Sequence, residues 1–155
     1  GQKITRFWPS ARICDHGRPD DVQQCMKLLR DFHNRSIHVP FRYDILEKNL
    51  IFLNLMTQPS RYPDHDEVQT RCYDMAPILE AYQHTSVLSH CDTVADNFLF
   101  INENGTLDLR LIDWEYAGEC DPCVDLGMFA NDADYDIHFD CIDMACPKTI
   151  KENTK

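Results

Sequence analysis

Apolar residues recur at helical spacing through the first half of the chain. Behind the acidic pair Asp20 and Asp21, one face of the pattern is apolar, which predicts a helix over about residues 21–32. The residues of that face are Val22, Cys25, Met26, Leu29 and Phe32. A second helix is predicted over 43–56 and a third over 66–84, where Pro77 should produce a kink.

The spacing changes after Ser86, where short apolar runs bounded by turn residues replace the helical pattern. Residues 98–101 and 107–112 predict two strands, and Asn104-Gly105 between them is typical of a tight β-hairpin turn. The remaining predicted elements are a short strand over 4–8, a short apolar segment over 86–89 and a helix over 122–130. The predicted fold class is therefore α+β, mainly helical, with one small β-hairpin.

Charge narrows the set of partners. Asp and Glu outnumber Lys and Arg by 26 to 15, which gives a formal net charge of -11. This charge argues against nucleic acid and against an anionic membrane surface, and it favours a cationic small molecule. The sequence has neither an apolar run long enough to span a membrane nor the pattern of a signal peptide, so a cytoplasmic location is expected.

Cysteine usage adds one alternative. We expect all eight cysteines to be reduced thiols, because a cytoplasmic location is expected. Cys120 and Cys123 have the spacing of metal ligands, but the next pair, Cys141 and Cys146, is spaced too widely for a zinc ribbon.

Three polar side chains flank the predicted hairpin. His90-x-Asp92-x-x-x-x-Asn97 precedes its first strand, and Asp113 follows its second. Because paired strands bring their far ends together, Asn97 and Asp113 should meet at the open end of the hairpin, close to Asp92. A single Asp beside a strand is usually a cap or turn residue. The whole motif, with a hairpin and a second Asp at its end, arises by chance much less often.

This combination suits phosphoryl transfer. Asp92 could orient or deprotonate an attacking hydroxyl group, and Asn97 and Asp113 could supply hard oxygen ligands to Mg²⁺. Protein kinases have the same order of residues, a His-x-Asp, an Asn five positions after the Asp and then a metal-binding Asp.

The residues around this motif resemble the choline and ethanolamine kinases, within the aminoglycoside phosphotransferase superfamily. The resemblance is carried by 88–99, by Asp121-Pro122, by Asp125-Leu126-Gly127 and most specifically by Ile112-Asp113-Trp114-Glu115-Tyr116-Ala117-Gly118. It implies the C-terminal lobe of a protein-kinase-like fold. In that division, 1–10 would be the last upper-lobe strand and hinge, 11–146 a truncated lower lobe and 147–155 a polar tail.

The resemblance also implies roles for single residues. Asp92 would be the catalytic base, and His90 would be the second catalytic residue of the same loop. Asn97 and Asp113 would bind Mg²⁺, and Asp125 would brace the loop. For ATP, the implied nucleotide-binding residues are Arg6, Phe7, Trp8, Leu99 and Ile112. Tyr116 would meet the ammonium group of choline or ethanolamine through a cation–π contact, and Glu115 would add negative charge.

The sequence departs from the family in two respects. Cys91 stands where relatives usually have Asn, and Thr93 stands where they usually have an apolar residue. No glycine-rich loop occurs, so the chain is expected to lack most of the upper lobe and to be inactive alone. A non-catalytic remnant that binds nucleotide or metal, and an aminoglycoside-type phosphotransferase, are the alternatives. The sequence leaves the oligomeric state open.

Overall fold

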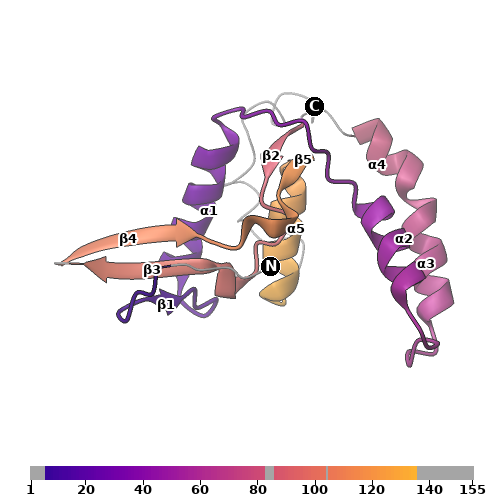
Figure 1. The fold of residues 1–155 in the computed structure, drawn as a ribbon, viewed down its shortest axis with the longest axis horizontal. Helices are drawn as coiled ribbons and strands as arrows, with labels where there is room; N and C mark the ends of the chain where they lie inside the picture. Colours follow the sequence, from indigo (N-terminus) through magenta and orange to yellow (C-terminus); the bar gives the residue numbers. More distant parts are fainter. Residues whose placement is uncertain (1–5, 83–85, 104, 136–155) are drawn as a thin grey trace.

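Two bodies of structure are seen in the computed structural model, which describes residues 6–82, 86–103 and 105–135. One body contains α1, two small sheets and α5, and the other is a set of three helices, α2, α3 and α4, here called the helical arm (Figure 1). The helices are α1 Pro19–His33, α2 Ile45–Leu55, α3 His65–Asp74, α4 Ala76–Tyr82 and α5 Cys123–Asp132, with 3₁₀ turns η1 Ala95–Asn97 and η2 Trp114–Tyr116.

All paired strands are antiparallel and form two sheets. One sheet has the order β1-β3-β4 and the other pairs β2 with β5. The strands are β1 Arg12–Ile13, β2 Val87–Ser89, β3 Phe98–Glu103, β4 Thr106–Leu111 and β5 Gly118–Cys120. The predicted hairpin is confirmed as β3–β4, and Gly105 adopts the left-handed conformation that its turn requires, with a φ of 81°.

The core lies between α1, β3 and α5. The buried face of α1 consists of the predicted residues Val22, Cys25, Met26 and Leu29, and it packs against Phe98 and Phe100 of β3 and Phe129 of α5. Val22, Cys25, Met26 and Leu29 are spaced three or four positions apart, so they share one side of the helix. This packing fixes the position of the strand that directly follows the Asp92 loop.

A partly buried ion pair joins β1 to this core. Arg12 of β1 makes a two-pronged contact with the buried carboxylate of Asp21, at 2.5 and 2.8 Å, and its guanidinium lies 4.3 Å from the ring centre of Phe100. The hydrogen bond from Arg12 holds the pKa of Asp21 below its usual value. Asp21 is therefore not merely the N-terminal charge that the sequence suggested.

Three expected elements differ from the structure. The helix expected over 66–84 is two helices separated at Met75, and Pro77 sits in the first turn of α4, where a missing N–H is harmless. Arg6, Phe7 and Trp8 lie outside any strand, and the strand beside the hairpin is β1 instead. The expected fold class, mainly helical, describes the fold only loosely, because strands β2 to β5 lie around the whole candidate site.

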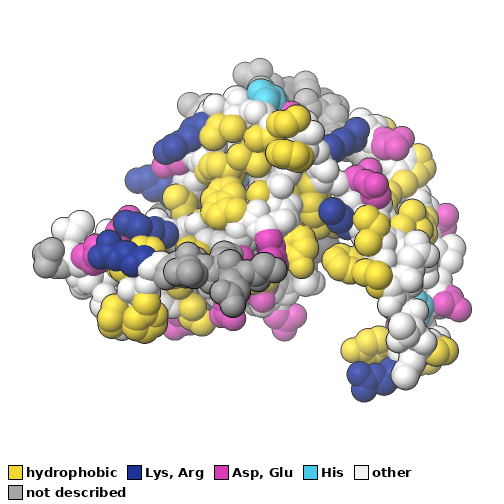
Figure 2. Space-filling view, in the orientation of Figure 1, with side chains coloured by type: hydrophobic (Ala, Val, Ile, Leu, Met, Phe, Trp, Pro, Cys, Tyr) yellow, Lys and Arg dark blue, Asp and Glu magenta, His cyan; other side chains and the backbone are white. Residues whose placement is uncertain are grey.

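The helical arm is unusual in its exposure. No residue of α2 or α3 is buried, and large apolar side chains such as Phe52, Leu55 and Ile78 are more than half exposed. The space-filling view shows the arm standing away from the rest of the molecule, with hydrophobic side chains on its surface (Figure 2). Within the described residues, no helix is long and apolar enough to cross a bilayer.

Candidate active site

The carboxylate of Asp125 anchors the loop that follows β2. Asp125, fully buried in the first turn of α5, accepts hydrogen bonds from the backbone N–H of His90 at 3.0 Å and of Cys91 at 2.7 Å. The same carboxylate lies 2.8 Å from Nε2 of His33, the last residue of α1. A buried carboxylate with three donors is held in one orientation, so the loop is tied to both α1 and α5.

Backbone and imidazole contacts bring the end of the hairpin to this loop. The N–H of Ile112 donates to the carbonyl oxygen of Asn97 at 2.9 Å, and Nε2 of His90 donates to the carbonyl oxygen of Ile112 at 2.7 Å. The next residue, Asp113, has φ 67° and ψ 59°, a left-handed conformation that Asp tolerates better than most residues. The chain therefore turns sharply at Asp113, beside Asn97.

Asn97 connects the loop internally. Its Nδ2 donates to the carboxylate oxygen of Asp92 at 2.9 Å and to the carbonyl oxygen of Asp92 at 2.7 Å. The side-chain oxygen of Asn97 accepts no hydrogen bond from the residues that the structure describes. With its amide nitrogen occupied, Asn97 presents its oxygen as a ligand, and oxygen is the atom that Mg²⁺ binds.

The donor set fits magnesium better than zinc. No group of three or more His, Cys, Asp and Glu side chains suited to a metal ion occurs in the described part of the chain. Mg²⁺ usually takes only one or two protein ligands and completes its shell with water and phosphate oxygens. Asn97 and Asp113 could form such a pair, whereas a tetrahedral zinc site at Cys120 and Cys123 would need further ligands.

A pocket of about 510 Å³ opens beside Asp113. Its lining contains every residue that the sequence resemblance assigned to nucleotide binding, together with Asp113. The lining residues are Arg6, Phe7, Trp8, Ala11, Leu99, Ile112 and Asp113. The indole of Trp8 lies 5.5 Å from the guanidinium of Arg6 and 5.0 Å from that of Arg110, so the pocket combines aromatic surface with positive charge.

The segment after Asp113 forms η2, which carries the two residues assigned to the substrate. Glu115 and Tyr116 are exposed, and 39% of the Tyr116 surface is accessible. Trp114 packs edge-on against the imidazole of His90, with ring centres 4.7 Å apart. Tyr116, which the sequence assigned to substrate binding, is thus an accessible aromatic ring one turn beyond Asp113.

Tyr43 is a neighbour of the site that the sequence did not reveal. Burial raises the pKa of its phenol, and the nearby Cys91, Cys120, Asp92 and Tyr116 raise it further. Tyr43 is held there by its own backbone, because its N–H donates to the carbonyl oxygen of Glu119 at 3.0 Å. No local signal marks this residue, since its neighbours are all distant in sequence.

The approach of Tyr43 depends on Gly118. A Cβ at position 118 would lie 3.0 Å from both the backbone nitrogen and the Cβ of Tyr43. Residues 41–43 run alongside β5, with Arg42 paired in parallel to Glu119. Gly118 thus lets residues 41–43, which lead into the helical arm, pass directly over β5, the strand next to the Asp92 loop.

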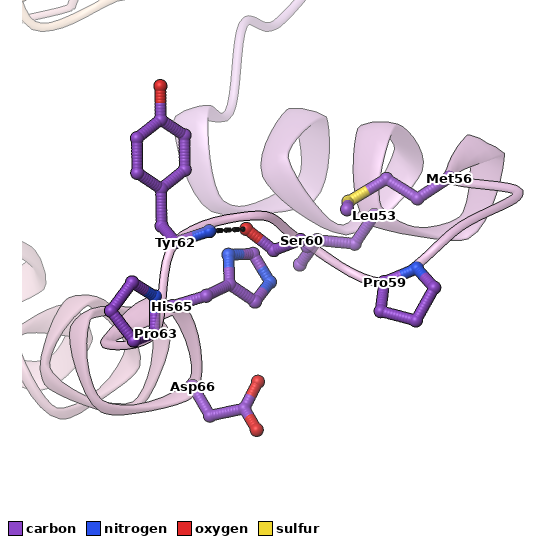
Figure 3. Close-up of a pocket in the computed structure, with 8 residues that line it drawn as sticks. All are labelled: Leu53, Met56, Pro59, Ser60, Tyr62, Pro63, His65 and Asp66. Carbon is purple, nitrogen blue, oxygen red and sulfur yellow. Dashed lines mark hydrogen bonds between the residues drawn. The ribbon is translucent and has the colours of Figure 1, made fainter.

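A further pocket, of about 490 Å³, lies at the far end of the helical arm (Figure 3). It is formed by one short stretch, from Leu53 at the end of α2 to Asp66 in the first turn of α3. There the N–H of Tyr62 donates to the hydroxyl of Ser60 at 3.2 Å. None of the residues assigned from the sequence lines this pocket.

The structure brings most of the predicted site residues together. Asp92, Asn97 and Asp113 gather around the open end of the hairpin, and the nucleotide-binding set shares one pocket. His90, predicted as catalytic, is fully buried and uses its Nε2 to hold Ile112. His33, which the sequence did not single out, completes the anchor at Asp125.

Comparisons with known proteins identify relatives of this arrangement. A family model described as choline/ethanolamine kinase matches residues 17–154. Two solved structures have the same fold, a choline/ethanolamine kinase family protein from Mesorhizobium loti (TM-score 0.70, 23% identity) and choline kinase LicA from Streptococcus pneumoniae (TM-score 0.75, 19% identity). A LicA structure in complex with AMP also matches, with a TM-score of 0.74 and 17% identity over 92% of this chain.

The coverage of these matches is unequal. The first two cover 86% and 92% of this chain but 45% and 50% of the relatives, so the chain spans about half the length of the solved structures. No curated protein matches the sequence. Because the family model covers most of the chain, the chain belongs to the choline/ethanolamine kinase family.

Proposed function

We propose that this chain provides the catalytic loop, the magnesium ligands and part of the nucleotide pocket of an ATP-dependent phosphotransferase. The proposed acceptor is the hydroxyl group of choline or a related amino alcohol. One observation carries the proposal: a single pocket joins the aromatic and apolar surface of Phe7, Trp8 and Leu99 to Asp113, which lies next to Asn97 and the Asp92 loop. The assignment to a kinase-like lower lobe, with its boundaries at residues 10 and 146, belongs to the same proposal.

Asp92 is proposed to orient the acceptor hydroxyl and to accept its proton. The hydrogen bond from Asn97 fixes one carboxylate oxygen, which leaves the other for the substrate. His90 does not touch the substrate in this proposal. It is a positioning residue, because its buried imidazole links the start of the loop to Ile112 and so to Asp113.

Asn97 and Asp113 are proposed to hold Mg²⁺. The ion supplies positive charge to phosphate oxygens when it is bound. The protein's part is to hold both ligands in place, and the two backbone hydrogen bonds of Ile112, the residue before Asp113, contribute to this. Phe7, Trp8, Leu99 and Ile112 would enclose the adenine ring of ATP. A structure of the relative LicA is a complex with AMP, which supports a nucleotide in this fold.

Tyr116 and Tyr43 are proposed to border the ammonium site. An aromatic face attracts a quaternary ammonium group by about 0.5–2 kcal/mol, depending on exposure. Glu115 and the net charge of -11 favour a cation. The proposed substrate class is supported by aromatic and acidic side chains near Asp92 and by the names of the solved relatives.

Nucleotide binding provides the first test. In a Trp114→Phe background, Trp8 is the remaining tryptophan and lines the pocket, so its fluorescence should change when ATP and Mg²⁺ are added. Asp113→Ala should weaken this binding, and Asp92→Asn should leave it close to the parent value. An unchanged signal in the parent, or unaltered affinity in Asp113→Ala, would remove the nucleotide assignment.

Turnover provides the second test, as choline-dependent ADP release by a form of the protein that covers the full length of its solved relatives. Asp92→Asn should lower turnover by about 10²–10⁴-fold, the usual contribution of a general base. Asp74→Asn, the same change at an exposed residue of α3, is the matched control and should have no effect. Full activity in Asp92→Asn would sink the assignment. Nucleotide binding without any turnover would favour the non-catalytic remnant, and phosphorylation of an aminoglycoside but not of choline would favour the third candidate.

A further inference from the structure

Two thiols meet directly behind the proposed catalytic base. Sγ of Cys91, the residue before Asp92, lies 3.6 Å from Sγ of Cys120 at the end of β5. Both side chains are almost fully buried, with 2% and 4% of their surfaces exposed. The β2–β5 pairing places Cys120 opposite Val87, and Cys91 follows β2 in a left-handed conformation, with its Sγ 3.7 Å from the carbonyl oxygen of Ser89.

The two thiols are not equivalent. The hydrogen bond from Cys91 lowers the pKa of Cys120, and a contact from Ser89 lowers it further, against the opposing effect of burial. The same thiol–thiol contact raises the pKa of Cys91. We assign Cys120 as the attacking thiol because it lines an open pocket whose lining does not include Cys91, and because the thiolate is the reactive form.

Cys120 can also be reached from outside. It lines a pocket of about 300 Å³ between the root of the helical arm and the β5–α5 turn, together with Tyr43, Asp121 and Cys123. A molecule the size of hydrogen peroxide fits such a space. Cys91 does not line this pocket.

We propose that Cys91 and Cys120 form a peroxide-sensitive pair whose disulfide displaces the catalytic loop. The sulfur of Cys120 attacks one oxygen of the peroxide, the O–O bond breaks, and Cys120 becomes a sulfenic acid while one water leaves. The sulfur of Cys91 then attacks the sulfenic sulfur, the S–O bond breaks, the S–S bond forms, and a second water carries away the proton of Cys91. Two electrons pass from the two thiols to one peroxide, and a dithiol reductant returns them.

The geometry explains why this bond would matter for catalysis. A disulfide requires about 2.05 Å between the sulfur atoms, so they must approach by roughly 1.5 Å. Cys91 has little freedom, because its φ is 62° and its N–H is held by Asp125 at 2.7 Å. The movement therefore reaches Asp92, the next residue. A misplacement of about 1 Å in an active site can cost about 10²-fold in rate.

Peptide mapping tests the pair without any assay of activity. Cleavage before aspartate places each thiol on its own peptide, since Cys91 falls in 74–91, Cys120 in 113–120 and Cys123 in 121–124. After exposure to hydrogen peroxide and alkylation of the remaining thiols, mass spectrometry should find peptide 74–91 joined to peptide 113–120. Dithiothreitol should separate them.

Variants define the outcome. Cys120→Ser should abolish the cross-link, and Cys72→Ser, a change at an exposed thiol of α3, should leave it intact. The core thiols Cys14 and Cys25 should still be alkylated after the protein is denatured. A cross-link between Cys120 and Cys123, or recovery of Cys91 in alkylated form under conditions that oxidise other cysteines, would overturn the proposal.

The effect on catalysis rests on the proposed function and is measured separately. In the full-length form, peroxide should lower choline-dependent turnover by about 10²-fold, and dithiothreitol should restore it. The loss should be absent in Cys120→Ser. A cross-link that forms with no loss of turnover would refute the displacement of the loop. Absence of turnover before oxidation would instead refute the proposed function and leave the mapping result as the test of the pair.

Discussion

Replacing Asp125 with Asn tests whether its carboxylate anchors the Asp92 loop. The two oxygens of Asp125 accept from the backbone N–H of Cys91 and of His90, and one of them also faces Nε2 of His33. Asparagine has the same shape but only one acceptor oxygen. In either orientation its amide group must face one of the two backbone donors, so at least one charge-assisted hydrogen bond becomes a contact between donors.

The expected loss follows from these contacts. A hydrogen bond to a charged group contributes about 1.5–3 kcal/mol, and a buried donor left without a partner adds a cost of similar size. We therefore expect Asp125→Asn to lower the free energy of unfolding by about 2–4 kcal/mol, a large part of the about 5–15 kcal/mol that is usual for a domain.

Urea denaturation followed by circular dichroism measures this loss, with unchanged m-values as the condition for comparison. Asp132→Asn is the matched control on the same helix. Its carboxylate accepts from the N–H of Ala95 at 2.8 Å but is exposed, so the variant should lose less than about 1 kcal/mol. Equal losses in the two variants would refute the view that Asp125 anchors the loop.

Three other outcomes are expected. Gly118→Ala should destabilise the protein by about 1–3 kcal/mol, because the new Cβ would meet the backbone of Tyr43 at 3.0 Å. Gly127→Ala should stabilise it by about 0.5–1 kcal/mol, because that helical position has nothing within 4 Å, and thermal melting compares the two variants. Acid should also weaken the fold through Asp21. Its folded pKa lies below the unfolded value of about 3.9, so its contribution is complete above that pH and is lost as the pH falls through the folded pKa. Arg12→Met should reduce this dependence in urea titrations between about pH 5 and pH 2, and an unchanged slope would contradict the role of the ion pair.

The sequence predicted the elements whose signals are local. The apolar face of α1 and the Asn-Gly turn of the hairpin are written in a few adjacent residues, and both elements occur where they were expected. The pairing of β2 with β5 was not predicted. It joins two three-residue strands about thirty positions apart, which are too short for alternation to be visible.

The same distinction holds for the site. Asp92, Asn97 and Asp113 could be proposed because the hairpin between them is itself recognisable, and its closure brings them together. His33 and Tyr43 could not, because each takes its place through contacts with residues far away in the chain. The division of the long predicted helix at Met75 was missed for a different reason, since proline was expected to bend the helix from within.

The three contacts of the Asp125 carboxylate have a consequence for the order in which parts of the chain fold. His33 and Asp125 are separated by 92 positions, and His90 and Cys91 precede Asp125 by 35 and 34. Contacts of such long separation form late, because the intervening chain must first lose its freedom. During synthesis, α1 and the β3–β4 hairpin can form while the loop at His90 still lacks its anchor. The proposed catalytic residues should therefore be the last part of the described fold to become ordered, and hydrogen exchange should show their amides protected after those of β3.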